Sequence, residues 1–213
     1  MQNDSFSLTS HQIEALTTGS IAIFPTETIY GIGCSAWSEQ SLQRIFQIKG
    51  RAPDQPPPIL IDDRRQLSTL VAEVSPLAAN LMEKYWPGSM TLILPAHPDL
   101  APSLSGFSAD GKIKTVGVRQ TDHLIAREIC RQIGAPFIAT SANFSGATGR
   151  AAAPHLLDDI PEDFRRQVDI IIDGGVLRGT PSTIVDCVGI PPRVIRLGAV
   201  ELSDEELLIL RET

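Results

Sequence analysis

The chain has 213 residues, of which 42% are apolar and 20% are charged, so it is long enough to bury an ordinary hydrophobic core. Its net charge of −7, from 18 basic and 25 acidic residues, argues against a protein that holds nucleic acid across a broad face, because such binding needs a surplus of Lys and Arg. A local basic cleft is compatible with an acidic protein, and a site for a small anion would have that form.

Hydrophobic spacing in the first half of the chain alternates between helical and extended patterns. Helical spacing is clearest at Leu42, Ile45 and Phe46, where Ser38 is placed to cap the helix, and Ser75 followed by proline opens another. In chain order, the pattern predicts a helix over 11–19, a strand over 21–24, a helix over 38–49, a strand over 59–61, a helix over 75–85 and a strand over 90–94.

The second half continues in the same way after a polar, glycine-containing loop over 100–111. Asp122 is placed to cap the next helix. The predicted elements are a strand over 115–119, a helix over 122–133, strands over 137–140, 169–172, 183–186 and 194–197, and a terminal helix over 203–211.

Interleaved strands and helices of this kind predict one α/β domain, an open twisted mixed sheet flanked by helices. The strands are short and mostly apolar, as expected of strands buried on both faces. The polar residues at their ends would then gather at one rim, where ligands of open α/β sheets bind.

The cysteines and the N-terminus indicate the cytoplasm. Cys34, Cys130 and Cys187 are odd in number and far apart, with no Cys-x-x-Cys pair, which is typical of free thiols in a reducing compartment. Residues 1–5 have no basic region of a signal peptide, and no apolar run is long enough for a membrane span. We therefore expect a cytoplasmic protein that does not enter a membrane.

Two cations with one residue between them, Lys49 and Arg51, stand at the end of the helix over 38–49. They are either solvated charges at a helix C-terminus, where the dipole favours cations, or ligands of a polyphosphate. The strand over 21–24 leads upstream into Thr26 and Thr28, and hydroxyl donors beside paired cations suit a small, strongly anionic molecule.

The segment over 31–36 matches G-x-G-x-x-A, yet a dinucleotide site is a poor interpretation. Its glycines do not open a helix directly after the strand, because helical spacing starts only at Ser38. The acid expected about 20 residues further on falls in a cationic stretch.

A second polar cluster, over 140–146, follows an apolar strand. It is either a capped turn or a shelf of hydrogen-bonding groups for phosphate or ribose oxygens. Ser141 is a poor candidate for a nucleophile, because no G-x-S-x-G motif surrounds it. Arg119 stands at the end of a predicted strand, Ser182 at the start of one and Arg196 within one, and either a rim salt bridge or an anion clamp would explain each of them.

Resident metals and P-loop nucleotide binding are not predicted. The four histidines have no ligand spacing, and no G-x-x-x-x-G-K-[ST] loop occurs.

Several of these segments together resemble the YrdC family of threonylcarbamoyl-AMP synthases. The similarity covers residues 8 to 200 approximately, and its motifs occur in the family's order. They are Pro-Thr-Glu-Thr-Ile-Tyr-Gly over 25–31, Lys-Gly-Arg over 49–51, Trp-Pro-Gly-Ser-Met-Thr-Leu over 86–92, Val-Gly-Val-Arg over 116–119, Thr-Ser-Ala-Asn-Phe-Ser-Gly over 140–146, Ile-Asp-Gly-Gly over 172–175 and Pro-Ser-Thr-Ile-Val-Asp over 181–186.

The resemblance implies a YrdC-like fold with a concave, positively lined cavity, and an enzyme that converts L-threonine, bicarbonate and ATP into threonylcarbamoyl-adenylate and pyrophosphate. The product would pass to the proteins that modify tRNA, with at most a weak direct contact to tRNA. ATP is the implied nucleotide, and Mg²⁺ is expected on its phosphates. Residues 8–200 would form the catalytic domain and 201–213 a short C-terminal helix or tail.

Position in the motifs implies a role for each polar residue. The catalytic set, which also binds ATP, would be Lys49, Arg51, Ser141 and Asn143. Two further ATP ligands would be Thr115 and Arg196. Threonine would be held by Thr28, Arg119 and Ser182.

Three positions depart from the family pattern. Leu60 stands where many relatives have His and cannot hydrogen-bond the threonine side chain, Gln55 replaces Asn, and Gly149 replaces a common Ser. Two other functions stay open: an RNA-binding module of the same fold without catalysis, and a relative that transfers a carbamoyl group from carbamoyl phosphate.

Overall fold

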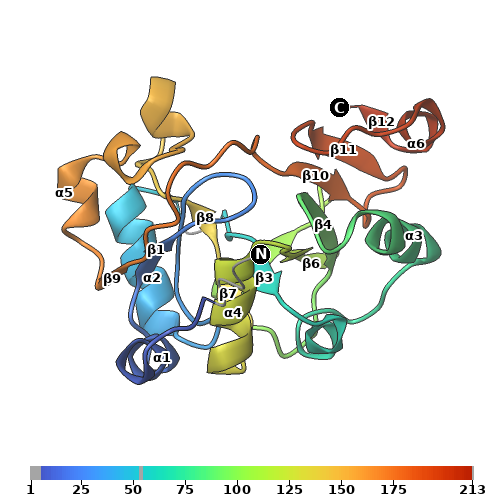
Figure 1. Ribbon diagram of the computed structural model, residues 1–213. Coiled ribbons are helices and arrows are strands. Elements are labelled where there is room, and N and C mark those ends of the chain that lie inside the picture. Colours follow the sequence, from blue (N-terminus) through green and yellow to red (C-terminus); the bar gives the residue numbers. More distant parts are fainter. Residues whose placement is uncertain (1–5, 53–54, 213) are drawn as a thin grey trace.

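The computed structural model describes residues 6–52 and 55–212, and it has the mixed α/β fold that the sequence predicts (Figure 1). Its α-helices are α1 (Ser10–Thr17), α2 (Glu39–Lys49), α3 (Pro76–Tyr85), α4 (Leu124–Ile133), α5 (Glu162–Arg165) and α6 (Asp204–Ile209). Its strands are β1 (Ala22–Phe24), β2 (Gly31–Gly33), β3 (Ile59–Ile61), β4 (Met90–Pro95), β5 (Gly106–Phe107), β6 (Lys114–Gln120), β7 (Phe137–Ile138), β8 (Thr140–Ser141), β9 (Ile170–Ile171), β10 (Thr183–Asp186), β11 (Arg193–Arg196) and β12 (Arg211–Glu212). Each predicted strand overlaps an observed one.

The strands divide between two mixed sheets. Sheet A has the order β8-β2-β1-β9, and sheet B has the order β12-β11-β10-β4-β6-β3-β7, with β5 paired to β6. In sheet A, β1 runs parallel to β9 and antiparallel to β2. In sheet B, β4 runs parallel to β10 and antiparallel to β6.

Residues 137–141 cross from one sheet to the other. Strand β7 pairs with β3 in sheet B, and β8 pairs with β2 in sheet A. Between them, the N–H of Ala139 donates to the carbonyl of Pro58 at 3.0 Å. The polar cluster that begins at Thr140 therefore lies where the two sheets meet.

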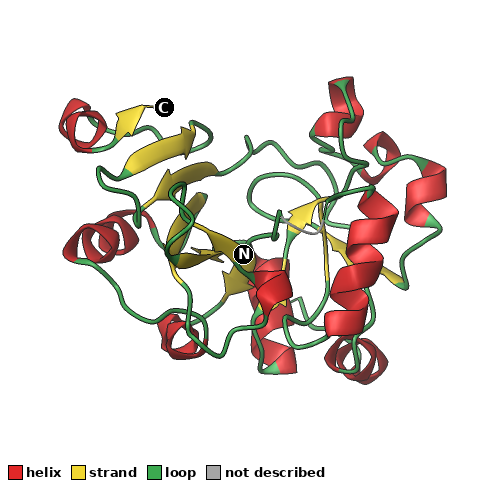
Figure 2. Cartoon of the chain, turned by 180° about the vertical axis from the view of Figure 1, so that it is seen from behind, coloured by secondary structure: helices red, strands yellow, loops and turns green. Residues whose placement is uncertain are grey.

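Helices cover both faces of sheet A. Side chains alternate across a strand, so Ile23 of β1 joins a cluster that includes Leu42 and Phe46 of α2, whereas Phe24 joins a second cluster with Leu16 of α1. Helix α4 adds to the second cluster. Figures 1 and 2, seen from opposite sides, show α4 and α1 in front of the sheet and α2 behind it.

Two predicted helix caps are wrong in their details. Ser38 is the residue before α2, but its hydroxyl shares a hydrogen bond with that of Ser41 (2.7 Å) and caps no backbone N–H. His123, not Asp122, precedes α4, because the N–H of His123 donates to Oγ1 of Thr121 (3.3 Å) and turns the chain one residue later. Ser75 caps α3 as predicted, through the N–H of Ala78.

Strand β2 was not predicted, because Gly31 and Gly33 made its segment look like a turn. The glycines instead allow strands to pack closely. A Cβ at Gly33 would lie 1.8 Å from the carbonyl oxygen of Ile138. The loop predicted over 100–111 likewise contains a short 3₁₀ helix (Pro102–Leu104) and β5.

The C-terminal segment packs against sheet B and α3. Leu210 is fully buried in the main hydrophobic cluster, and Glu206 of α6 accepts hydrogen bonds from Lys84 (2.9 Å) and Tyr85 (2.7 Å). Among residues 6–52 and 55–212, no helix is both long and apolar enough to cross a membrane.

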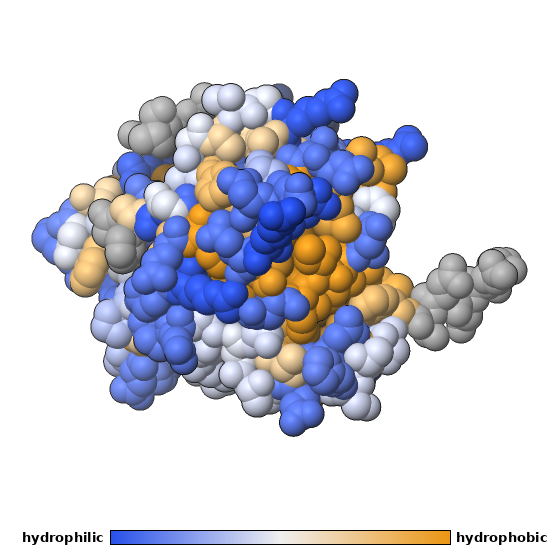
Figure 3. Space-filling view, turned by 90° about the vertical axis from the view of Figure 1, so that its left-hand side faces the viewer, coloured by the Kyte–Doolittle hydropathy of each residue, from blue (hydrophilic) through white to orange (hydrophobic). Residues whose placement is uncertain are grey.

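Strand β9 is an edge strand, since it pairs with β1 alone in sheet A. Its Ile171 is 43% exposed. Figure 3 views the molecule from the side on which β9 and α5 lie in Figure 1, and an apolar area bordered by hydrophilic residues is visible there.

The cysteines agree with the prediction of free thiols. Cys34 and Cys130 are buried and Cys187 is half-buried, and all three are unpaired. Burial raises the pKa of the Cys34 thiol to about 12, so it is not a reactive thiolate. The prediction that the chain has no signal peptide rests on residues 1–5, which lie outside the described part of the chain.

Candidate functional site

One cavity of about 240 Å³ brings together residues from both sheets. Its wall combines hydroxyl and guanidinium groups with apolar side chains such as Ile29 and Ala139. Six of the nine predicted site residues line it: Thr28, Arg51, Arg119, Ser141, Ser182 and Arg196. Residues as far apart in sequence as 28 and 196 therefore share one hollow.

The end of α2 places Lys49 and Arg51 beside the cavity. Gly50 has a φ of +60°, a left-handed conformation that ends the helix and that glycine adopts readily. The N–H of Arg51 donates to the carbonyl of Phe46 (3.0 Å), and the carbonyl of Lys49 accepts from Ser145 (2.7 Å). The helix end is thus tied to the turn after β8.

Lys49 is only 3% exposed and does not line the cavity. Its Nζ donates to the carbonyls of Ser141 (2.6 Å) and Asn143 (2.8 Å) and to Oδ1 of Asn143 (2.9 Å), so each N–H of an ammonium has an acceptor. Burial, and to a lesser degree the charge of Arg51, lower the pKa of Lys49 to about 7. Lys49 therefore holds the 141–143 turn from behind the cavity wall.

Asn143 is likewise a support for the wall rather than part of it. Its Oδ1 accepts from the hydroxyl of Ser141 (2.7 Å), and its Nδ2 donates to the carbonyl of Ala152 (2.7 Å). Ser141 and Ala152 both line the cavity. Asn143 thereby joins two parts of the lining.

Arg51 reaches the cavity while bonded to neutral oxygens. Its Nε donates to the carbonyl of Gln55 (2.7 Å), its Nη1 to Oγ1 of Thr140 (3.1 Å) and its Nη2 to the carbonyl of Pro56 (3.4 Å). Burial lowers its pKa. No carboxylate among the described residues pairs with it, so its charge is available to an anion.

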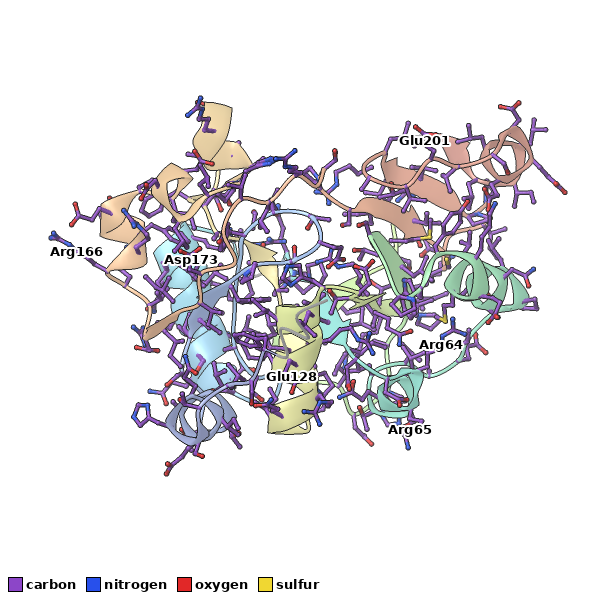
Figure 4. The ribbon with its side chains drawn as sticks, in the orientation of Figure 1. Arg64, Arg65, Glu128, Arg166, Asp173 and Glu201 are labelled. Carbon is purple, nitrogen blue, oxygen red and sulfur yellow. The ribbon has the colours of Figure 1, made fainter. Side chains whose placement is uncertain are left out.

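The segment over 25–31 forms a tight polar turn. Oγ1 of Thr26 donates to the carbonyl of Ile29 (2.7 Å) and shares a hydrogen bond with Oγ1 of Thr28 (2.7 Å). The hydroxyl of Tyr30 donates to Asp173 (2.9 Å), which is labelled in Figure 4. The same hydroxyl accepts from the N–H of Gly174 (2.8 Å), so this turn is tied to the segment after β9.

Arg119, near the end of β6, forms a buried ion pair. Its Nη1 lies 3.2 Å from Oε1 of Glu27, and the two side chains are 8% and 11% exposed. The same Nη1 is 3.5 Å from Oγ1 of Thr28. Oε2 of Glu27 accepts from Oγ1 of Thr121 at 2.5 Å. This cation, unlike Arg51, faces a carboxylate.

Ser182 connects the third arginine to the cavity. Arg196 donates from Nε to the carbonyl of Ser182 (2.9 Å) and from Nη2 to its hydroxyl (3.0 Å). The same hydroxyl lies 3.0 Å from Oγ1 of Thr91, which is fully buried. Partial burial of the Arg196 guanidinium, followed by the nearby charge of Arg119, lowers its pKa.

Three predicted site residues do not line the cavity: Lys49, Asn143 and Thr115. Lys49 and Asn143 hold its wall. Thr115 is buried in β6, where it pairs with Pro95 and Gly106.

Sequence reasoning also missed cavity residues. Tyr30 and Thr91 line it but were not predicted, whereas Thr26 and Thr140 line it and belonged to polar clusters that the sequence did identify. Alternation along β4 could have indicated Thr91, a polar residue in an otherwise apolar strand.

The structure explains how Leu60 and Gln55 can depart from the family pattern. Leu60 is fully buried in the cluster under α4 and does not line the cavity. The side chain of Gln55 is exposed, and its backbone carbonyl is the part that contacts Arg51. Gly149 lies outside the lining and has a φ of +60°, a conformation that a Ser would adopt only with strain.

Metal-ligating side chains do not gather here. Within residues 6–52 and 55–212, no three His, Cys, Asp or Glu side chains are grouped so that they could hold a metal ion. The charge of the cavity therefore comes from Arg51, Arg119 and Arg196, with Glu27 as a counter-charge to one of them.

The fold and this cavity together define an α/β protein with an arginine-rich site suited to a small anion. A family model described as telomere recombination, for Sua5, YciO and YrdC proteins, matches residues 14–198. The chain belongs to this Sua5/YciO/YrdC family.

Curated relatives carry one enzyme name. A threonylcarbamoyl-AMP synthase of Pyrococcus abyssi is 38% identical over 192 residues, which cover 90% of this chain and 54% of that protein. A threonylcarbamoyl-AMP synthase of Thiobacillus denitrificans is 33% identical over 172 residues, covering 80% of this chain and 86% of that protein. This chain thus spans about half the length of the first relative and most of the second.

Solved structures agree with the family. The crystal structure of Pyrococcus abyssi Sua5 complexed with L-threonine superposes with a TM-score of 0.84 at 34% identity, over 95% of this chain and 58% of that one. The crystal structure of Escherichia coli YciO gives a TM-score of 0.77 at 27% identity, over 90% of this chain and 89% of that one.

Proposed function

We propose that this chain makes L-threonylcarbamoyladenylate from L-threonine, bicarbonate and ATP and releases pyrophosphate. One observation carries the proposal: Arg51 and Ser141, for a polyphosphate, share a single cavity with Thr28, Arg119 and Ser182, for an amino acid. Support comes also from the relatives named threonylcarbamoyl-AMP synthase.

The triphosphate would lie against the end of α2 and the turn after β8. Arg51 is free of carboxylate partners in the described structure and offers a bidentate fork to phosphate oxygens. Lys49 adds positive charge from behind the wall, and Ser141 adds a hydroxyl. At about 240 Å³ the cavity is smaller than the roughly 300–1,000 Å³ of typical small-molecule sites, so the nucleotide would pass Arg196 in the wall and extend beyond the cavity toward Thr115.

The amino acid would lie at the other end. Arg119 would hold the carboxylate of threonine, and the hydroxyls of Thr28 and Ser182 would orient the rest. The relative solved in complex with L-threonine supports this choice of ligand.

The chemistry needs no covalent link to the protein. The amine of threonine attacks bicarbonate and water leaves, which gives a carbamate. A carbamate oxygen then attacks the α-phosphorus of ATP, the bond to the β-phosphate oxygen breaks and pyrophosphate departs. The protein would place the two substrates together and neutralise the charge that grows on the departing pyrophosphate.

ATP would bring Mg²⁺ with it. The described residues offer no cluster of ligands for a resident metal, so the ion would be held by phosphates and water. The product would pass to proteins that transfer the threonylcarbamoyl group to tRNA in the cytoplasm, and any direct contact with tRNA would be weak. Residues 8–200 would be the catalytic domain and 201–213 a terminal segment, of which residue 213 lies outside the described part.

An assay of pyrophosphate release, with ATP, bicarbonate and threonine left out in turn, tests the proposal. We expect release only when all three are present. Release without threonine would contradict it. Turnover with carbamoyl phosphate in place of bicarbonate would indicate the carbamoyl-transfer alternative. A salt-sensitive tRNA complex without any release would indicate the RNA-binding alternative.

A further inference from the structure

A buried carboxylate beside Arg119 has no part in the function as proposed so far. Glu27 does not line the cavity, and its side chain is 11% exposed. A carboxylate is costly to bury unless it is paired. Its partner is the cation to which the proposal assigns the amino-acid carboxylate.

We propose that Glu27 is a positioning residue that fixes Arg119 for the carboxylate of the amino-acid substrate; this rests on the proposed function. Glu27 would set the affinity for the amino acid and leave the affinity for ATP unchanged.

The first argument is how Arg119 is held. Nη1 lies 3.2 Å from Oε1 of Glu27 in an ion pair, and it donates to Oγ1 of Thr28 at a long 3.5 Å. Oε1 of Glu27 and Nε of Arg119 are both buried without a hydrogen-bond partner among the described residues, so the pair is held by charge and not by a hydrogen bond. Glu27 is therefore the nearest charged group to this guanidinium, and it forms the one ion pair that Arg119 makes among the described residues.

The second argument is how Glu27 is held. Its Oε2 accepts from Oγ1 of Thr121 at 2.5 Å, and Thr121 is fully buried just beyond β6. A Cβ at Gly179 would lie 2.1 Å from the carbonyl oxygen of Glu27, so the backbone of the 173–182 segment packs directly on it. Glu27 is therefore held both at its carboxylate and at its backbone carbonyl.

The third argument is the contrast with the other cavity arginines. Arg51 and Arg196 are held by carbonyl and hydroxyl oxygens, which orient a cation without neutralising it. Only Arg119, among the described arginines of the cavity wall, is paired with a carboxylate. The partly neutralised Arg119 has less net charge to offer than Arg51, so it suits one carboxylate of a zwitterion, which depends more on a fixed donor, better than a polyanion.

Glu27→Gln is the sharpest variant, because it keeps the shape of the side chain and an oxygen for Arg119 but removes the charge. We expect KM and Kd for threonine to rise about tenfold, with kcat and the Kd for ATP within about twofold of the wild type. Thr121→Val, which removes the hydrogen bond that orients Glu27, should raise the threonine KM about threefold. Glu83→Gln is the matched control, because it makes the same chemical change in an exposed ion pair that does not line the cavity. Oε2 of Glu83 lies 3.1 Å from Nη1 of Arg64, and Arg64 is labelled at the right of Figure 4.

The outcomes separate the two proposals. Calorimetry of wild-type protein that shows no threonine binding, together with no pyrophosphate release, would end the proposed function. Wild-type binding with an unchanged threonine KM in folded Glu27→Gln would overturn the role of Glu27 alone. Equal losses of threonine and ATP affinity would also overturn it, because they would indicate a general structural role. If Glu27→Gln does not fold, Thr121→Val decides by the same readout.

Discussion

The two ends of the cavity hold their cations in different ways. At the end of α2, Lys49 and Arg51 are bonded to carbonyl, amide and hydroxyl oxygens. At the end of β6, Arg119 forms an ion pair with the carboxylate of Glu27. Among the described residues, the cations at the end of α2 therefore have no carboxylate partner, whereas the charge of Arg119 is offset by Glu27.

The difference shows how one cavity can distinguish a polyanionic substrate from a zwitterionic one. A triphosphate gains most where positive charge is uncompensated, because Coulomb attraction grows with the charge on both partners. An amino acid carries one carboxylate and one amine, and it needs a well-oriented donor more than net charge. The proposed division, triphosphate at Arg51 and threonine at Arg119, follows from this contrast.

Removal of Arg51 should have the largest effect. We expect Arg51→Ala to lower kcat/KM for pyrophosphate release by about 10²–10³, because a charged donor to the transferring phosphates is lost. A control is Arg65→Ala, since the Arg65 side chain is 90% exposed and projects outward at the lower right of Figure 4. Equal rates in the two variants would remove Arg51 from the phosphate end.

Ser182→Ala should act at the other end with a smaller effect. The change removes the acceptor of Arg196 Nη2 and leaves the buried hydroxyl of Thr91 without its partner. We expect about a tenfold rise in the threonine KM with little change in the KM for ATP. Ser68→Ala, at an exposed serine bonded only to the carbonyl of Arg65 in the described structure, is the control. A rise in the ATP KM alone would reverse the assignment.

Lys49 should make ATP binding depend on pH. Because burial and Arg51 lower its pKa from 10.5 to about 7, a fraction of free protein lacks this proton near neutrality. A bound triphosphate favours the charged form, so we expect uptake of up to about one proton per ATP near pH 8. Calorimetry in two buffers of different ionisation enthalpy measures it.

The matched variant for this effect is Lys49→Arg, which stays charged and should show less uptake than the wild type. Equal uptake in both would contradict the role of Lys49.

The same lowered pKa of Lys49 also sets how the stability of the fold depends on pH. The folded protein binds this proton less tightly than the unfolded chain, so the contribution of Lys49 to stability rises with pH between about 7 and 10.5.

Glu206, outside both ends, should affect stability alone. Burial by itself would raise its pKa, but hydrogen bonds from Ser203, Tyr85 and Lys84 outweigh burial and lower the pKa to about 2. We expect Glu206→Gln to reduce the free energy of unfolding by about 1 kcal/mol, or roughly 2–4 °C in Tm, with both substrate affinities unchanged. The stabilisation is fully present above the ordinary pKa near 4.5 and is lost as pH falls towards 2, so the two proteins should converge in acid. A change in activity at neutral pH would show that α6 influences the cavity.

Much of the fold was predictable, because apolar spacing and caps are local signals. Helix α3 begins after Ser75 as predicted, and β10 has the predicted bounds. Strand β2 was not predictable in this way, since its glycines are required by the close approach of Ile138, a contact made over a hundred residues away. The crossing at 137–141 is also non-local, so a single predicted strand became two strands in two sheets.

The candidate site was likewise predictable only where the signal is local in the sequence. Motifs identified Arg51, Arg119 and Ser182, which line the cavity. They did not show that Lys49 lies behind the wall, because that depends on carbonyl oxygens of residues 141 and 143. Nor did they reveal the pairing of Glu27 with Arg119, which joins positions 92 residues apart. Local sequence gives the type of chemistry, and the fold decides which groups face the ligand.

Calorimetric titration of two variants with each substrate tests the division of the cavity most directly. Arg51→Gln should lose ATP affinity at least about tenfold and keep its threonine affinity, and Arg119→Gln should do the reverse. If both variants lose affinity for the same substrate, or if neither loses any, the two ends do not serve different ligands and the account is wrong.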